Sequence, residues 1–107
     1  MIKVSAYQNE EGRIKGFCMS GHAEYADHGE DIICAAVSAL VINAVNSVET
    51  FTEDVFSFEA EEDGGRMEFM ITSDISDKSI LLMNSLFLGL QGIQDSYGQE
   101  YITIISE

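Results

Sequence analysis

Residues 32–51 read IICAAVSALVINAVNSVETF and are mostly apolar, with many alanine and valine residues. The stretch is longer than an ordinary strand and does not alternate between apolar and polar side chains. These features predict a largely buried helix, about 30 Å long at a rise of 1.5 Å per residue. Asp31 directly precedes the stretch and is a favoured N-cap residue, so we expect the helix to begin at Ile32.

Shorter segments in which apolar and polar residues alternate lie on both sides of this helix. Such alternation is typical of a strand with one buried face. The segments form two pairs around turn-forming residues: 2–7 and 13–20 around Asn9–Gly12, and 56–61 and 67–72 around Glu62–Gly65. The second turn, with its Asp-Gly-Gly sequence, is a strong hairpin signal.

A second helix is predicted for residues 77–96, with Ser76 or Asp77 as the N-cap and Gly98 as the stop. Its central part, SILLMNSLFLGLQGI, is apolar on nearly all sides. That pattern indicates either a helix at the centre of the core or one that forms a subunit interface. Residues 101–106, rich in isoleucine and threonine, are predicted to form the last strand.

The predicted order of elements is therefore ββαββαβ within a single domain of residues 1–107. We expect an α+β fold in which two helices pack on one face of a mainly antiparallel sheet.

The formal net charge of −14 comes from 19 acidic and five basic residues. Direct binding to nucleic acid is not expected, because phosphate contacts require clustered lysine and arginine. The negative charge favours a basic partner or a basic peptide substrate, although it also serves solubility alone.

The N-terminal residues 1–15 lack the apolar segment of a signal peptide. The strongest apolar run, residues 35–45, is short for a membrane span and is interrupted by Ser38 and Asn43. We therefore expect a cytoplasmic protein with no membrane partner. In a reducing compartment, its two cysteines are expected to be free thiols.

Cys34 is the stronger candidate for chemistry among these cysteines. A helix that begins at Ile32 places Cys34 in the first turn, where unpaired N–H groups and the helix dipole favour a thiolate. The same N–H groups can stabilise an oxyanion on a substrate carbonyl. The alternative is a buried, inert cysteine, and for Cys18, within a predicted strand, that alternative is favoured.

A cysteine nucleophile needs a base, and His22 and His28 are the only histidines in the chain. His22 follows the second predicted strand and is expected to be held rigidly, whereas His28 lies within a loop. Rigid positioning favours His22. A zinc site made of Cys18, His22, His28 and Cys34 is the competing interpretation, but the spacing of these residues is poor for zinc. We therefore expect no metal.

The loop that separates His22 from the predicted helix is bounded by Gly21 and Gly29. It is long enough to act as a lid over a site. Its acidic residues, which include Glu24 and Asp27, either contact a basic substrate or are simply solvated.

Gly-His-Ala at residues 21–23, followed by GEDIICAAVSAL at residues 29–40, resembles the signature of the ribosomal-processing cysteine protease family Prp. The resemblance extends over essentially the whole chain, including its length, its acidic character and the predicted order of elements. Ile33 stands where valine is common in that signature, a substitution between similar apolar side chains.

The resemblance implies an endopeptidase with a Cys–His dyad, in which Cys34 is the nucleophile and His22 the general base and acid. Asp31 and Ser38 also fall on motif positions. Asp31 either orients His22 or caps the helix, and Ser38, one turn after Cys34, either bonds to the dyad or satisfies buried polar groups.

The family resemblance further implies that the substrate is a large-subunit ribosomal protein from which a short N-terminal extension is removed. It also implies a homodimer and no cofactor. The alternative function is a non-catalytic, dimeric module that binds ribosomal components through its acidic surface.

Overall fold

The computed structural model describes residues 1–21, 28–62 and 65–106, with residues 28–31 described by their backbone alone. The described residues form two helices and one five-stranded sheet in the predicted order ββαββαβ. The elements are β1 (Ile2–Gln8), β2 (Ile14–Ser20), α1 (His28–Phe51), β3 (Phe56–Ala60), β4 (Arg66–Ile71), α2 (Asp77–Tyr97) and β5 (Ile102–Ser106).

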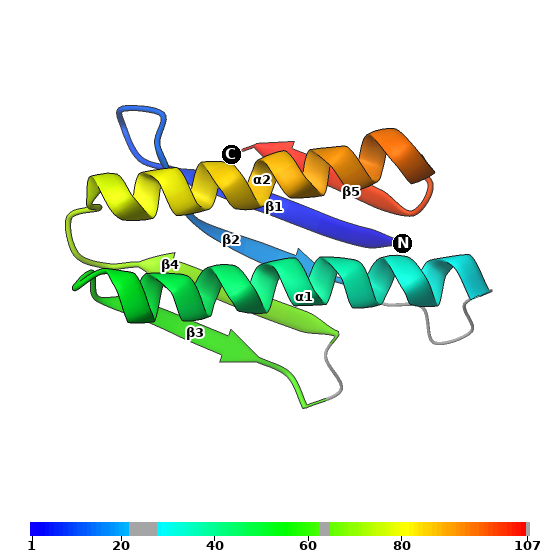
Figure 1. The fold of residues 1–107 in the computed structure, drawn as a ribbon, viewed down its shortest axis with the longest axis horizontal. Coiled ribbons are helices and arrows are strands. Elements are labelled where there is room, and N and C mark those ends of the chain that lie inside the picture. Colours follow the sequence, from blue (N-terminus) through cyan, green and yellow to red (C-terminus); the bar gives the residue numbers. More distant parts are fainter. Residues whose placement is uncertain (22–27, 63–64, 107) are drawn as a thin grey trace.

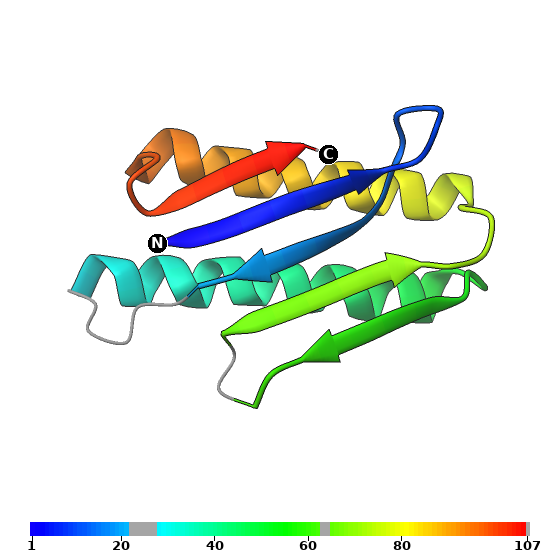
Figure 2. The ribbon, with the colours of Figure 1, turned by 180° about the vertical axis from the view of Figure 1, so that it is seen from behind.

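The strands lie in the order β3-β4-β2-β1-β5. Neighbouring strands are antiparallel except for β1 and β5, which are parallel and pair Val4 with Ile104. Both helices cover one face of the sheet, and the other face carries no helix (Figures 1 and 2). The α+β fold and the mainly antiparallel sheet are therefore confirmed.

The core lies between the sheet and the two helices, as the alternation along the strands requires. Val4, Phe17 and Phe69 are fully buried on the helix-covered face. The rings of Phe17 and Phe69, which are Cα partners on β2 and β4, stack with their centroids 5.4 Å apart. Aromatic pairs across neighbouring strands stabilise a sheet directly, so this contact joins its two hairpins.

The first turn follows the prediction closely. The side-chain oxygen of Asn9 accepts hydrogen bonds from the N–H groups of Glu11 and Arg13, both at 2.9 Å. Gly12 adopts a φ of 80°, a left-handed conformation that glycine takes without steric cost. In the second turn, residues 63–64 lie outside the described residues.

Helix α1 begins at His28, four residues before the predicted start at Ile32. Asp31 therefore lies inside the helix, and its predicted role as the N-cap is wrong. The sequence allows the longer helix, because Glu30 and Asp31 are acidic and acids are favoured in the first turn by the helix dipole.

One side of α1 packs on the sheet. Its buried side chains recur every three or four residues, as on one helical face: Ile33, Val37, Val41, Ala44, Val45 and Val48. By length and composition, residues 32–51 of this helix also meet the requirements of a membrane span, contrary to the expectation from residues 35–45. In this structure the stretch serves as a core helix.

Helix α2 begins and ends as predicted. Ser76 is the N-cap and accepts a hydrogen bond from the Ser79 N–H at 3.2 Å, while Gly98 ends the helix with a φ of 107°. One face of α2 contributes Met83 and other residues to the core, whereas Leu81 and Leu88 point outward and are 69% and 76% exposed. The helix therefore has both a core face and an exposed apolar stripe.

Candidate active site

The beginning of α1 and the end of β2 lie at the same end of the molecule, close to the start of β1 (Figures 1 and 2). Gly21 is the last described residue after β2, and its N–H donates a hydrogen bond of 2.9 Å to the Gly65 carbonyl. Gly65 directly precedes β4. This end of the fold therefore brings together β2, β4 and the helix that carries Cys34.

Cys34 is a free, half-buried thiol that packs against the core from α1. Because α1 begins at His28, Cys34 is the seventh residue of the helix rather than the third. The helix dipole and the unpaired N–H groups act mainly within the first turn. The prediction that Cys34 lies in that turn is wrong, and the helix-end argument for a reactive thiol does not apply to Cys34.

Ser38 follows Cys34 by one helical turn on the same side of α1, and both residues are half-buried. The helix therefore presents a thiol and a hydroxyl in one line along its surface. The role of Ser38 beside the nucleophile stays a prediction.

Several predicted site residues lie in the part of the chain that the structure does not describe, or describes by its backbone alone. His22, Glu24 and Asp27 lie outside the described residues, so the proposed dyad and the acidic lid stay predictions. His28 and Gly29 lie in the first turn of α1, so the predictions that His28 lies within the loop and that the loop extends to Gly29 are wrong. Asp31 lies in the same turn.

Cys18 occupies β2 between the buried residues Phe17 and Met19, so its side chain lies on the sheet face without helices. Close by on this face, Arg66 forms an ion pair of 2.9 Å with Glu68. The ionisable thiol of Cys18, followed by the Glu68 carboxylate, raises the pKa of Arg66 above its ordinary value. Cys18 is thus part of a different surface from Cys34.

A zinc site that uses both thiols is disfavoured by this arrangement, since the sheet lies between Cys18 and α1. Within the part of the chain whose side chains are described, no three histidine, cysteine or acidic residues lie close enough to hold a metal ion. The two histidines fall outside that part, so the expectation that the protein holds no metal stays a prediction.

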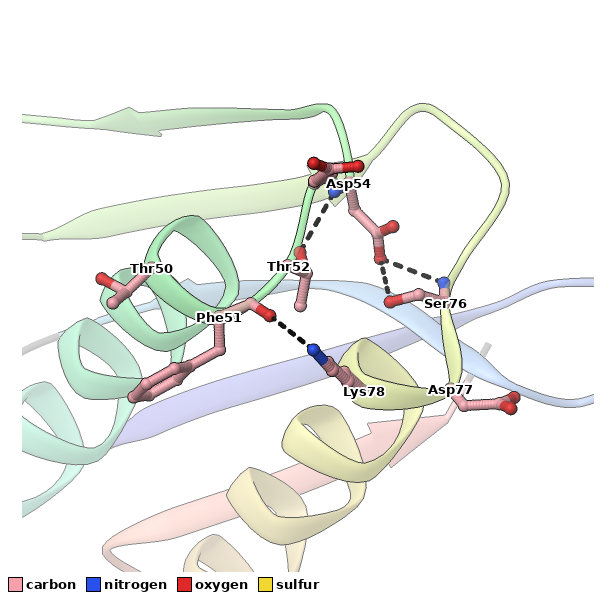
Figure 3. A pocket seen from close by; sticks show the side chains of 8 residues that line it. Thr50, Phe51, Thr52, Asp54, Ser76, Asp77 and Lys78 are labelled. Carbon is pink, nitrogen blue, oxygen red and sulfur yellow. Dashed lines mark hydrogen bonds between the residues drawn. The ribbon is translucent and has the colours of Figure 1, made fainter.

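A hollow of about 570 Å³ lies at the opposite end of α1 and opens between that helix and the start of α2 (Figure 3). Phe51, which lines this hollow at the end of α1, lies about 25 Å along the helix from Cys34, at a rise of 1.5 Å per residue. In it, Asp54 Oδ2 accepts hydrogen bonds from the Ser76 N–H at 3.0 Å and the Ser76 hydroxyl at 2.8 Å. Lys78 Nζ donates to the Phe51 carbonyl at 3.4 Å.

The surroundings of the Asp54 carboxyl shift its pKa. Burial raises its pKa, but the nearby Ser79 hydroxyl and the two hydrogen bonds from Ser76 outweigh burial, so the pKa lies below its ordinary value of 3.8. The Ser79 Oγ is buried without a hydrogen bond of ordinary geometry and acts at longer range. These contacts stabilise the start of α2, and they are structural rather than catalytic.

Comparison with known proteins identifies the family to which this chain belongs. Residues 1–103 match the family described as cysteine protease Prp. The chain belongs to this family. A ribosomal processing cysteine protease Prp from Bacillus subtilis is 32% identical over 101 residues, which cover 91% of this chain and 90% of that protein.

Two solved structures of the Prp protease from S. aureus are similar over the full length of both chains. One, in complex with a substrate peptide, has a TM-score of 0.91 and 27% identity. The other, in complex with a covalently linked product peptide, has a TM-score of 0.89 and 28% identity. The protein is thus a cysteine protease of the Prp family, as the signature around Cys34 predicted.

Proposed function

We propose that this Prp-family protease removes the N-terminal extension of a large-subunit ribosomal protein. The observation that carries the proposal is the similarity, over the whole chain, to an S. aureus Prp protease bound to a substrate peptide. Ribosomal proteins are basic, so the net charge of −14 supports attraction between enzyme and substrate.

In the proposed mechanism, Cys34 is the nucleophile and His22 the general base and acid. His22 takes the thiol proton, and the sulfur attacks the scissile carbonyl carbon. Collapse of the tetrahedral intermediate breaks the C–N bond while His22 protonates the departing amine. His22 then activates a water molecule that hydrolyses the thioester and restores the Cys34 thiol.

The position of Cys34 supports this assignment. Its side chain is half-buried, and its helix is fixed to the sheet by buried neighbours such as Ile33 and Val37. A nucleophile on a rigid element keeps its geometry during the reaction. Because Cys34 lies beyond the first helical turn, we attribute the activation of its thiol to His22 rather than to the helix dipole.

Asp31 and Ser38 are proposed to support the dyad. Of the two roles predicted for Asp31, orientation of His22 is the one compatible with a helix that begins at His28. Gly21 is proposed to begin the lid loop, which ends where α1 begins at His28, and its acidic residues Glu24 and Asp27 would contact basic side chains of the substrate.

We further propose that the protein is a cytoplasmic homodimer that needs no cofactor and binds neither nucleic acid nor a membrane. The exposed stripe of α2 that contains Leu81 and Leu88 supports a subunit interface, because exposed apolar side chains that lie together on a surface often mark a protein–protein contact. Analytical ultracentrifugation should give the mass of a dimer for the wild type and a monomer for Leu81→Asn/Leu88→Asn. A monomeric wild type would contradict the interface.

The central test is cleavage of a peptide that spans the extension junction. Wild type and Cys18→Ala should cut the peptide, whereas Cys34→Ala should bind it without cutting. Undiminished cleavage by Cys34→Ala would remove the nucleophile assignment. If cells that carry Cys34→Ala still mature their large subunits, the non-catalytic binding module is the better description.

Thiol reactivity tests the dyad itself. Below about pH 8, iodoacetamide should label Cys34 much faster than Cys18, since a neighbouring histidine raises the thiolate fraction. The His22→Ala variant should lose that difference. Equal labelling rates in the wild type would show that Cys34 has no activating base.

A further inference from the structure

Two other parts of the fold restrict Gly21. Its backbone adopts a φ of +88°, in the left-handed region. Its N–H donates to the Gly65 carbonyl at 2.9 Å, at the entrance to β4. A Cβ atom added to Gly21 would clash with the Met1 carbonyl oxygen, just before β1. The chain is therefore fixed at the point where it leaves β2.

The packing at Gly21 leaves no room for a side chain. The atom that a Cβ would meet belongs to the backbone, so a rotamer change cannot relieve the contact. Gly12 offers the contrasting case, because its φ of +80° is similar but no atom lies within 4 Å of an added Cβ. The two glycines share a conformation and differ in what surrounds them.

We propose that Gly21 is a positioning residue for peptide cleavage, which fixes the direction in which the chain leaves the sheet toward His22. The inference rests on the proposed function, in which His22 is the base for Cys34. Gly21 directly precedes His22 in the sequence, and the two carbonyl groups next to it, of Gly65 and Met1, directly precede strands β4 and β1 of the sheet. Displacement of the backbone at Gly21 is therefore passed on to the next residue.

Gly21→Ala tests this role, with Gly12→Ala as the matched control. Because a misplacement of about 1 Å can cost on the order of a hundredfold in rate, kcat of Gly21→Ala should fall at least about tenfold while KM changes less than about twofold. Gly12→Ala should lose thermal stability through its strained φ but keep kcat within about twofold. Equal kcat losses in both variants, or none in Gly21→Ala, would overturn the inference.

Alkylation of Cys34 by iodoacetamide separates this inference from the proposed function. If the wild type fails to cut the peptide, the proposed substrate is wrong, but the pH profile of Cys34 alkylation still shows whether a base activates this thiol. Gly21→Ala should shift that profile toward the one of an ordinary cysteine. An unchanged profile would contradict a positioning role.

Amide hydrogen exchange of the wild type covers the case in which Gly21→Ala fails to fold. A fixed Gly21, hydrogen-bonded to Gly65, should exchange on the order of a hundredfold more slowly than an unprotected amide. Exchange at the unprotected rate would mean that Gly21 is not held in place, and the inference would fail.

Discussion

The contact between Asp54 and Ser76 should account for a measurable part of the folding free energy. Asp54 lies after α1 and Ser76 is the N-cap of α2, so their hydrogen bonds connect the end of one helix to the start of the other (Figure 3). Asp54→Ala removes the carboxylate, and Ser76→Ala removes both the hydroxyl and the cap to Ser79. The double variant measures how much the two residues depend on each other.

The magnitude follows from the two kinds of contact. Loss of a serine N-cap costs about 1 kcal/mol. A hydrogen bond to a carboxylate contributes about 1.5–3 kcal/mol when buried, and less where water reaches the carboxylate, as it does here. We expect a loss of about 1–2 kcal/mol for each single variant. The coupling energy should then be about 0.5–1.5 kcal/mol.

Urea denaturation at several pH values gives the stability loss of each single variant and the coupling energy between Asp54 and Ser76. The pKa of Asp54 is lower in the folded protein than its ordinary value of 3.8, so its contribution is complete above that value. The contribution is lost as the pH falls through the lower, folded-state pKa. The difference between wild type and Asp54→Ala should therefore be constant near about pH 7 and shrink at acidic pH.

Glu53→Gln is the matched control, because it removes one negative charge from the neighbouring, exposed residue. It should change the free energy of unfolding by less than about 0.5 kcal/mol. A coupling energy of zero between Asp54 and Ser76, or an Asp54→Ala variant as stable as Glu53→Gln, would refute this account of the helix junction.

Two further predictions concern packing, and thermal or urea unfolding measures both. Phe69 is fully buried and its ring contacts two others, so Phe69→Ala should cost about 3–5 kcal/mol, whereas Phe51→Ala, at a position 63% exposed, should cost far less. Similar losses in both would contradict the assigned core. Gly92→Ala in α2 should stabilise the protein by about 0.5–1 kcal/mol, because a helical glycine is replaced where no atom lies within 4 Å. Gly89→Ala should gain less, since its Cβ would lie 3.1 Å from a Leu40 methyl group, and a larger gain there than at Gly92 would contradict the packing of α2 on α1.

The features that short-range sequence patterns specify could be predicted well. The turn at Asn9–Gly12 and the ends of α2 at Ser76 and Gly98 depend on residues a few positions apart. Their side-chain chemistry favours one local conformation, and the surrounding fold does not override it.

The start of α1 was predicted wrongly because its signals conflict. Gly29 weakens a helix, and Asp31 is a favoured cap, yet the acids at the beginning of the helix are also favourable inside its first turn. Sequence alone does not rank these effects. The consequence for Cys34 was substantial, since a shift of one turn removes the helix-end argument for its reactivity.

Contacts between distant residues could not be predicted. Asp54 and Ser76 are 22 positions apart, and no sequence motif links the two residues. Gly21 could be identified as part of the signature, but its contact with the Met1 carbonyl depends on the pairing of β1 with β2. The proposal that Cys34 is the nucleophile came from the signature, while the position of Cys34 in α1 came from the fold.

The parallel pairing of β1 with β5 affects how the protein can fold during its synthesis. Residues 2–6 pair with residues 102–106, so the first strand gains its second neighbour only after almost the whole chain has been made. Pairing across such a separation slows folding, because a long loop must close before the contacts form. The hairpin of β1 and β2 can form early. Until the last strand emerges from the ribosome, however, the outer edge of β1 is open to pairing with other chains.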